Sequence, residues 1–252
     1  MKLAKILMPA LLIGFSSLAH ATDADEIIST YHENIGGEDA LKAMKGIKIV
    51  AEVSQGPMKF PLEIVQQSSG KQYTKATVQG QEIMQGVFDG ETLWSTNFMT
   101  MKAEKAQTEE TENMKLNMND FPDSLMDYAE KGYQAELMGT ESVDGEDTYK
   151  VKLVKEPITV EGEEIPSIEY YYFDAESMVL VMMESDIHSG PMKGQVQQIK
   201  MSDYQEVDGI YFPFAMTQGI KGQPAATSPL VINEIELNPT VDDSVFAFPA
   251  AQ

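Results

Sequence analysis

The sequence contains no cysteine and no arginine among its 252 residues. Without thiols the chain forms no disulfide, so disulfide-stapled scaffolds are excluded, and a lipoprotein signal would find no cysteine to acylate. Without arginine it lacks the planar guanidinium that binds phosphate or carboxylate in a bidentate manner. Phosphoryl-transfer chemistry is therefore disfavoured.

Positive charge is also scarce. The chain has 18 basic residues, all of them lysine, and 40 acidic residues, which gives a formal net charge of −22. A surface of this sign repels nucleic acid and anionic lipid head groups. We therefore expect no nucleic-acid partner and no membrane adhesion through a basic patch.

Long apolar runs are absent except near the start, where Ile6–Leu18 follows Lys2 and Lys5 and precedes Ala19-His20-Ala21. This run is shorter than the roughly 20 residues of a membrane-spanning helix. Lysines, an apolar run and a small-residue end follow one another as in a secretory signal peptide. We predict a signal peptide over residues 1–21 and an unlipidated, periplasmic mature protein over residues 22–252, in one domain with a net charge of −24.

Residues suited to catalysis are few. Beyond the predicted signal, His32 and His188 are the only histidines, and both are expected at the surface. The carboxylate pairs Glu109-Glu110 and Glu163-Glu164 are adjacent in sequence, which favours solvated charges over an acid and base pair. We find no nucleophile elbow and no phosphate loop, and predict no enzyme, catalytic residue or cofactor.

Methionine is abundant, at 17 residues. Flexible thioethers fill gaps in a core and also suit a surface that repacks around varied acyl chains. Met99-Thr100-Met101 and Met182-Met183 offer soft ligands for Cu(I), but without cysteine a metal site is not predicted.

Two short helices are predicted after the signal. Asp23 or Asp25 caps the first, which runs through His32 and ends at Gly36-Gly37, and the second covers Glu38–Lys45. Beyond Gly46 the hydrophobic period changes to two, as in antiparallel strands with one apolar face. The predicted strands are 47–53, 60–64, 72–78, 82–88, 92–96, 133–138, 148–154, 168–173, 179–185, 195–204, 211–218 and 230–237.

Asp89-Gly90, Asp144-Gly145 and Asp208-Gly209 are typical of tight turns between strands. Many short strands with such turns indicate a sandwich or a barrel. Lys102–Asn119 breaks the pattern and is expected as a long loop or a mobile helix. An amphipathic helix is expected to open at Asp120 and to leave an apolar groove above the sheet.

Several segments, in their order along nearly the whole mature chain, resemble the periplasmic outer-membrane lipoprotein-sorting proteins of the LolA/LolB-like superfamily. The segments that carry this resemblance are the helical region Asp25–Lys45 with Ile35-Gly36-Gly37, Phe88–Trp94, Tyr149–Leu153, Tyr172-Phe173-Asp174, Tyr204–Phe214 and Asp242–Pro249.

The resemblance implies a mainly β (α+β) fold, an incomplete antiparallel barrel of about eleven strands wrapped around a few helices, whose apolar concave face receives acyl chains. The expected function is a periplasmic carrier or chaperone that ferries a lipoprotein or lipid towards the outer membrane, with inner-membrane donor and outer-membrane acceptor proteins as partners. The expected cavity residues are Phe60, Leu62, Ile64, Trp94, Phe98, Tyr170, Tyr172, Met182, Phe214 and Met216, and the expected lid residues are Phe121, Leu125 and Tyr128.

One departure stands out, because typical LolA proteins carry a cavity arginine that helps to hold the closed state and this chain has none. A divergent relative with a different lipid or a particular lipoprotein as cargo fits the sequence better. Two alternatives stay open: a docking or assembly module of the envelope with a self-filled cavity, and a β-sandwich hydrolase that uses one of the two histidines.

Overall fold

The computed structural model describes residues 23–249, so the predicted signal peptide lies outside the described residues. Helix α1 (Ala24–Asn34) begins as predicted at Asp23, whose side chain accepts a hydrogen bond of 2.9 Å from the amide of Glu26. It ends before Gly36, and α2 (Glu38–Ala43) follows. Gly36 has a φ of +133°, and a Cβ there would lie 2.6 Å from the carbonyl oxygen of Gly209, so the turn requires glycine.

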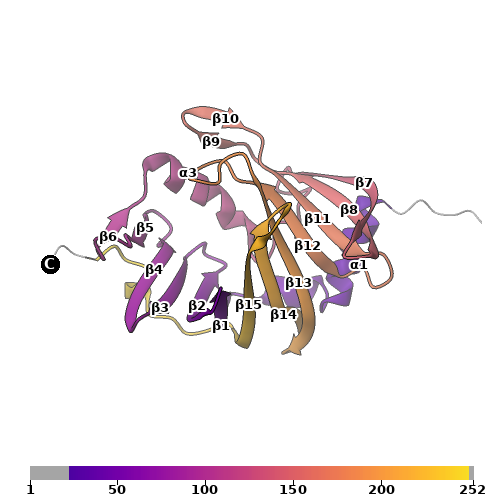
Figure 1. Cartoon of the computed structure of the whole chain (residues 1–252). Coiled ribbons are helices and arrows are strands. Elements are labelled where there is room, and N and C mark those ends of the chain that lie inside the picture. The colour runs from indigo at the N-terminus through magenta and orange to yellow at the C-terminus, as the bar shows by residue number, and fades with distance from the viewer. Residues whose placement is uncertain (1–22, 250–252) are drawn as a thin grey trace, which may run out of the picture.

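One antiparallel sheet of 13 strands runs through the molecule in the order β6-β5-β4-β3-β2-β1-β15-β14-β13-β12-β11-β8-β7. Strands β6 and β7 form its two edges, so the barrel is incomplete as expected, with more strands than the eleven predicted (Figure 1). The strands are β1 (Gly46–Gln55), β2 (Met58–Gln67), β3 (Gln72–Val78), β4 (Gln81–Phe88), β5 (Leu93–Thr96), β6 (Ala103–Lys105), β7 (Gln134–Val143), β8 (Glu146–Val154), β11 (Ile168–Asp174), β12 (Leu180–Asp186), β13 (Val196–Val207), β14 (Ile210–Ile220) and β15 (Gln223–Leu237).

The predicted turns are confirmed. Asp144-Gly145 joins β7 to β8 and Asp208-Gly209 joins β13 to β14, with positive φ at both residues of each pair. Positive φ at both central residues matches the right-handed twist of the flanking strands. The hairpin of β9 (Ile158–Val160) and β10 (Glu163–Ile165) lies apart from the main sheet and was not predicted.

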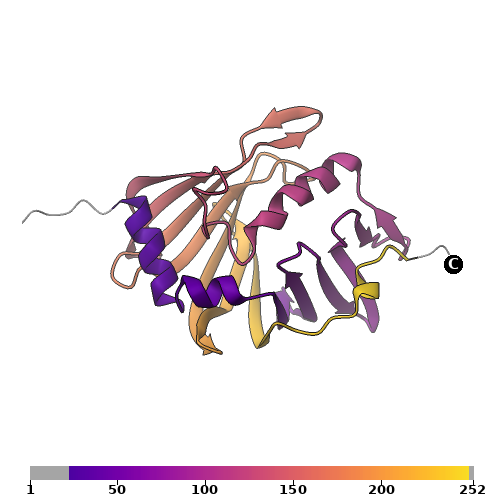
Figure 2. The same ribbon diagram turned by 180° about the vertical axis from the view of Figure 1, so that it is seen from behind.

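The stretch expected as a loop or mobile helix contains β6, helix α3 (Thr108–Leu116) and a short 3-10 helix η1 (Asn117–Asp120). The side chain of Asn113 in α3 exchanges hydrogen bonds of 2.6 and 2.9 Å with the backbone of Thr159 in β9. Helix α3 thereby bridges the open side of the half-barrel, on the side of the sheet that carries α1 and α2 (Figure 2).

The prediction of an amphipathic helix from Asp120 is wrong, because residues 121–122 form a bend and residues 124–132 form turns. Phe121 precedes Pro122 and is extended, with a φ of −90° and a ψ of 134°, since the proline ring disfavours helical geometry before it. The Asp123 carboxylate then accepts hydrogen bonds of 2.8 and 2.9 Å from the amides two and three residues ahead. These bonds cap a single turn, and the left-handed backbone of Asp127 ends it before a helix forms.

The main core lies between α1 and the inner face of the sheet. Ile27, Ile28 and Tyr31 of α1 are buried in it, and the Tyr31 ring lies 5.4 Å from the ring of Phe173 in β11. A second core lies on the opposite face of β2–β5, where the C-terminal segment brings Phe246 onto the sheet. The second core consists of Val65, Tyr73, Val87, Trp94 and Phe246.

Candidate functional site

Rows of cross-strand apolar neighbours cover the inner face of the sheet, which is the face that carries α1. Residues directly opposite each other on paired strands share a face. One row crosses five strands, β2, β1, β15, β14 and β13, and consists of Phe60, Val53, Leu230, Met216 and Met201. A second row consists of Ile83, Ala76, Leu62, Ala51 and Ile232. We call these two rows, with Ile64 and Phe214, the apolar face.

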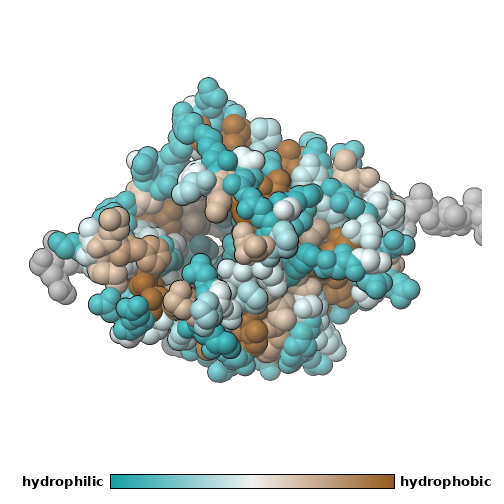
Figure 3. All heavy atoms as spheres, in the orientation of Figure 1, coloured by the Kyte–Doolittle hydropathy of each residue, from teal (hydrophilic) through white to brown (hydrophobic). Residues whose placement is uncertain are grey.

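The apolar face is covered only in part. Ala51 and Ile232 are buried in the same cluster as α1, which places the face on the helix side. Phe60, Leu62 and Met216 are half-buried, and so are Ile64 and Phe214. In the space-filling view the surface is hollowed beside α3 (Figure 3). The structure therefore brings five of the ten expected cavity residues together on one partly open surface.

The other five expected cavity residues lie elsewhere. Tyr170, Tyr172 and Met182 lie on the outer face of the sheet, because Tyr171 between the two tyrosines points into the main core. Trp94 is part of the second core, where its Nε1 donates a hydrogen bond of 2.9 Å to the carbonyl of Phe246. Phe98 lies in the turn between β5 and β6 with 66% of its surface exposed.

On the outer face, Tyr172 belongs to a polar cluster around the buried Glu184. This carboxylate accepts hydrogen bonds from the Tyr172 hydroxyl at 2.8 Å and from Gln198 at 2.6 Å, and it pairs with Lys221 at 2.9 Å. Burial alone would raise the pKa of Glu184, but these donors outweigh it and lower the pKa below its usual value. The cluster therefore supports the fold through an ionised carboxylate.

Replacing Glu184 with glutamine is expected to lower the free energy of unfolding at pH 7 by about 1–3 kcal/mol, because the hydrogen bonds to a charged acceptor are lost. The folded-state pKa lies below that of the unfolded chain, so this stabilisation is present above the unfolded pKa and is lost as the pH falls through the folded one. Urea unfolding between pH 7 and pH 3 measures it. The exposed Glu82→Gln serves as control, and an equal deficit at both pH values would contradict the expectation.

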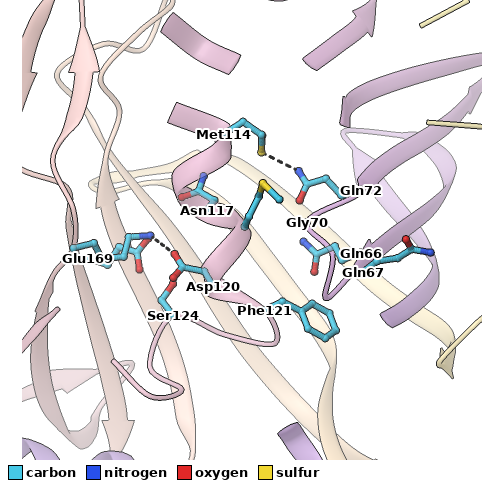
Figure 4. A pocket seen from close by; sticks show the side chains of 12 residues that line it. Gln66, Gln67, Gly70, Gln72, Met114, Asn117, Asp120, Phe121, Ser124 and Glu169 are labelled. Carbon is cyan, nitrogen blue, oxygen red and sulfur yellow. Dashed lines mark hydrogen bonds and ion pairs between the residues drawn. The ribbon is translucent and has the colours of Figure 1, made fainter. Parts of the chain in front are cut away.

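A polar pocket of about 320 Å³ lies at one end of the apolar face. Along β2 the inner side chains change from Phe60, Leu62 and Ile64 to Gln66, which lines the pocket. Figure 4 shows Gln66 and Gln72 beside α3 and η1, with Glu169 of β11 on the other side. The pocket is lined by Gln66, Gln67, Gly70, Gln72, Met114, Asn117, Met118, Asp120, Phe121, Ser124, Lys155 and Glu169.

The charged wall of the pocket is internally paired. Lys155 lies 2.9 Å from an Asp120 oxygen and 2.8 Å from a Glu169 oxygen, and its side chain is only 9% exposed. Burial alone would lower the pKa of Lys155, but the two carboxylates outweigh it and raise the pKa. Asp120 also accepts hydrogen bonds from Lys131 and from the Tyr133 hydroxyl, and the Tyr171 hydroxyl donates to Glu169.

The expected lid residues lie in two different environments. Phe121 is half-buried, lines the polar pocket and contacts the main core. Leu125 is 1% exposed within that core. The Tyr128 hydroxyl donates to Asp25 at the start of α1, and burial together with this carboxylate raises the pKa of Tyr128 to about 12. A lid role stays a prediction, and it is best placed at Phe121.

The expectation that His32 lies at the surface is wrong. It is 2% exposed, because it follows Ile28 by four residues and so shares the buried side of α1. Its Nε2 lies 3.5 Å from an Asp123 oxygen and has no hydrogen-bond partner among the described residues. His188 lies half-buried in the loop between β12 and β13, on a separate element.

Neither the polar pocket nor seven of the twelve residues of the apolar face were predicted from the sequence. Val53 lies in the predicted strand 47–53, but its pairing with Phe60 and Leu230 depends on strand register. The pocket residues Gln66, Asn117 and Glu169 come from three separate elements and share no local pattern. Only the fold brings them together.

Comparisons with solved structures support the fold directly. A LolA superfamily protein from Nitrosomonas europaea is 13% identical, with a TM-score of 0.52 over 90% of this chain and 98% of its own. A domain described as outer membrane lipoprotein-sorting, from Vibrio parahaemolyticus, is 10% identical, with a TM-score of 0.53 over 88% of this chain and 97% of its own. A DUF1329 family protein from Desulfovibrio piger is 11% identical, with a TM-score of 0.52 over 89% and 97%.

At the level of sequence, no curated protein matches the chain. Within residues 23–249, no helix combines the length and the apolar character that crossing a membrane requires. A family model described as "-like: Uncharacterized protein" matches residues 101–249, which is more than half of the chain. The chain therefore belongs to this family, and its fold is that of the LolA superfamily.

Proposed function

We propose that this protein is a periplasmic carrier that binds the acyl chains of a lipoprotein or lipid on its apolar face and conveys them towards the outer membrane. The observation that carries the proposal is the continuous apolar row from Phe60 to Met201, which stays partly open on the inner side of the half-barrel. The predicted signal peptide over residues 1–21 and the single domain over 22–252 are parts of this proposal.

The dimensions of the apolar face suit a fatty-acyl chain. From Phe60 to Gln66, β2 extends roughly 20 Å at about 3.3 Å per residue. Each methylene that leaves water on this face contributes about 0.8 kcal/mol. Met201 and Met216 add flexible thioethers to the row, which adapt to chains of different shape. Affinity would thus come from apolar area and would require no reactive group.

Transport in one direction requires more than a binding surface. A site with equal affinity for its cargo at the donor and at the acceptor shifts no equilibrium. Loading and release would therefore depend on partner proteins at the inner and outer membranes, or on a change in the cover of the apolar face. Phe121 and the α3–η1 bridge are the elements that we propose to move.

Mass spectrometry of the protein purified from its own periplasm tests the proposal. Native and solvent-extracted samples are compared, and a lipid or acylated peptide at near-stoichiometric amount is expected. If the purified protein carries no lipid or acylated peptide and takes up no acyl probe, the result would favour the alternative, a docking module of the envelope whose cavity is filled by its own side chains.

Neighbouring residues on β15 provide a matched pair of variants. Leu230 lies on the apolar face, whereas Val231 points outward and is 52% exposed. Leu230→Glu is expected to weaken binding of a pyrene-labelled acyl methyl ester by at least about tenfold, because a carboxylate enters an apolar contact. Val231→Glu introduces the same charge on the outer face and should bind normally. Equal affinities in the two variants would contradict a role for the apolar face.

A further inference from the structure

The polar pocket continues the apolar face. On β2 and β3 the inner side chains change from Ile64 and Thr74 to Gln66 and Gln72, which pair directly across the two strands. Phe121 lines the pocket and also packs against the main core, which includes Ala51 and Ile232 of the apolar face. A ligand whose acyl chain lies on the apolar face would therefore place its polar end in this pocket.

The pocket offers uncharged hydrogen-bonding groups. Gln66 and Asn117 both line it and are both exposed. Within residues 23–249, no hydrogen bond joins either of these side-chain amides to another protein group, so their donors and acceptors are free for a ligand. Among the described residues the Gln72 side-chain amide has one partner, the Met114 sulfur at 3.5 Å, and a thioether is a weak acceptor.

Free positive charge is absent from the lining. Lys155 is the lysine that lines the pocket, and it already lies between Asp120 and Glu169 at 2.9 and 2.8 Å. The chain has no arginine to bind an anion in its place. An anionic head group would thus meet two carboxylates without gaining an unpaired cation, and like charges brought close together disfavour binding.

We infer that the polar pocket binds the head group of the acylated ligand, and that this head group is uncharged and carries hydroxyl or amide groups. The inference rests on the proposed function and names its ligand class. The amides of Gln66 and Asn117 hold the head group, while the Asp120–Lys155–Glu169 cluster excludes phosphate and other anions.

Displacement of the pyrene-labelled acyl methyl ester from the full-length protein tests the inference. The two competitors are dioleoylglycerol and dioleoyl phosphatidic acid, which carry the same acyl chains and differ in the head group. Dioleoylglycerol is expected to displace the probe at a concentration at least about tenfold lower, since only phosphatidic acid meets the carboxylates.

Two variants assign the selectivity to the pocket. Glu169→Gln removes one of the two carboxylates beside Lys155. Because one partner of Lys155 then has no charge, the preference for dioleoylglycerol over phosphatidic acid is expected to fall by about threefold or more. Glu163→Gln makes the same change at an exposed position of β10 and should leave the preference unchanged. If Glu169→Gln fails to fold, Asn117→Leu replaces it, with weaker diacylglycerol binding and unaltered probe binding expected.

The outcomes separate the two proposals. If the probe binds and responds to Leu230→Glu, but phosphatidic acid competes as well as diacylglycerol, the head-group inference fails and the carrier proposal stands. If no acyl probe binds, both fail. A preference for diacylglycerol that Glu169→Gln reduces and Glu163→Gln retains supports the assignment.

Discussion

Replacing Leu125 with aspartate is expected to lower the free energy of unfolding at pH 7 by a large part of its total value. Leu125 is 1% exposed among the residues that contact α1, so the new carboxylate would be buried without a partner. Such a change costs about 4–5 kcal/mol or more, a large part of the 5–15 kcal/mol that usually separates folded from unfolded protein. Urea unfolding followed by circular dichroism measures the loss.

Two further variants show what Leu125 does. Leu125→Met keeps an apolar side chain of similar volume and should cost less than about 1.5 kcal/mol. Phe121→Asp places the same charge in the half-buried wall of the polar pocket, where the protein should fold and lose probe affinity. A Leu125→Asp protein with native stability would contradict the position of this side chain in the core.

Replacing Phe246 with alanine is expected to release the C-terminal segment from the sheet. Phe246 is fully buried in the second core, and its carbonyl accepts the hydrogen bond from Trp94. Truncation of a buried phenylalanine costs about 3–5 kcal/mol. Because Trp94 is the only tryptophan, its fluorescence emission should move to longer wavelength while the melting temperature falls.

Phe248→Ala is the matched control. The Phe248 ring meets the Trp94 indole edge to face at 6.1 Å but is only half-buried. An aromatic contact of this kind contributes about 0.5–1.5 kcal/mol beyond the buried area. The Phe248 variant should therefore lose less stability than the Phe246 variant, and a reversed order would show that the C-terminal segment is held elsewhere.

Local patterns allowed most elements to be predicted from the sequence. The alternation of Ile47, Ile49 and Ala51 identified β1, and the Asp-Gly pairs identified turns, because period and turn chemistry act over a few residues. Elements with weak local signals were missed. Strands β9 and β10 have three residues each, too few to show a period. The helix expected after Asp120 does not form because Phe121 before Pro122 is extended and Asp127 is left-handed, and both conformations interrupt a helix.

Which residues form a common surface depended on register. Tyr170 and Tyr172 were predicted as cavity residues because they lie in a run of aromatics. Successive side chains of a strand point to opposite faces, however, and Tyr171 points to the inner face. The period of two leaves open which set points inward. Packing of α1 against Tyr171 and Phe173 decides it.

By itself, the sequence determined the mainly β class, the positions of most strands, the cap of α1 and the absence of thiols and guanidinium groups, because each of these follows from composition or from neighbours within a few residues. The tertiary structure alone decided that Phe60 and Leu230 flank Val53 on either side of β1, that His32 is buried, and that Gln66, Asn117 and Glu169 line one pocket. These contacts join residues far apart in the chain, and strand pairing and helix packing specify them where no local pattern does.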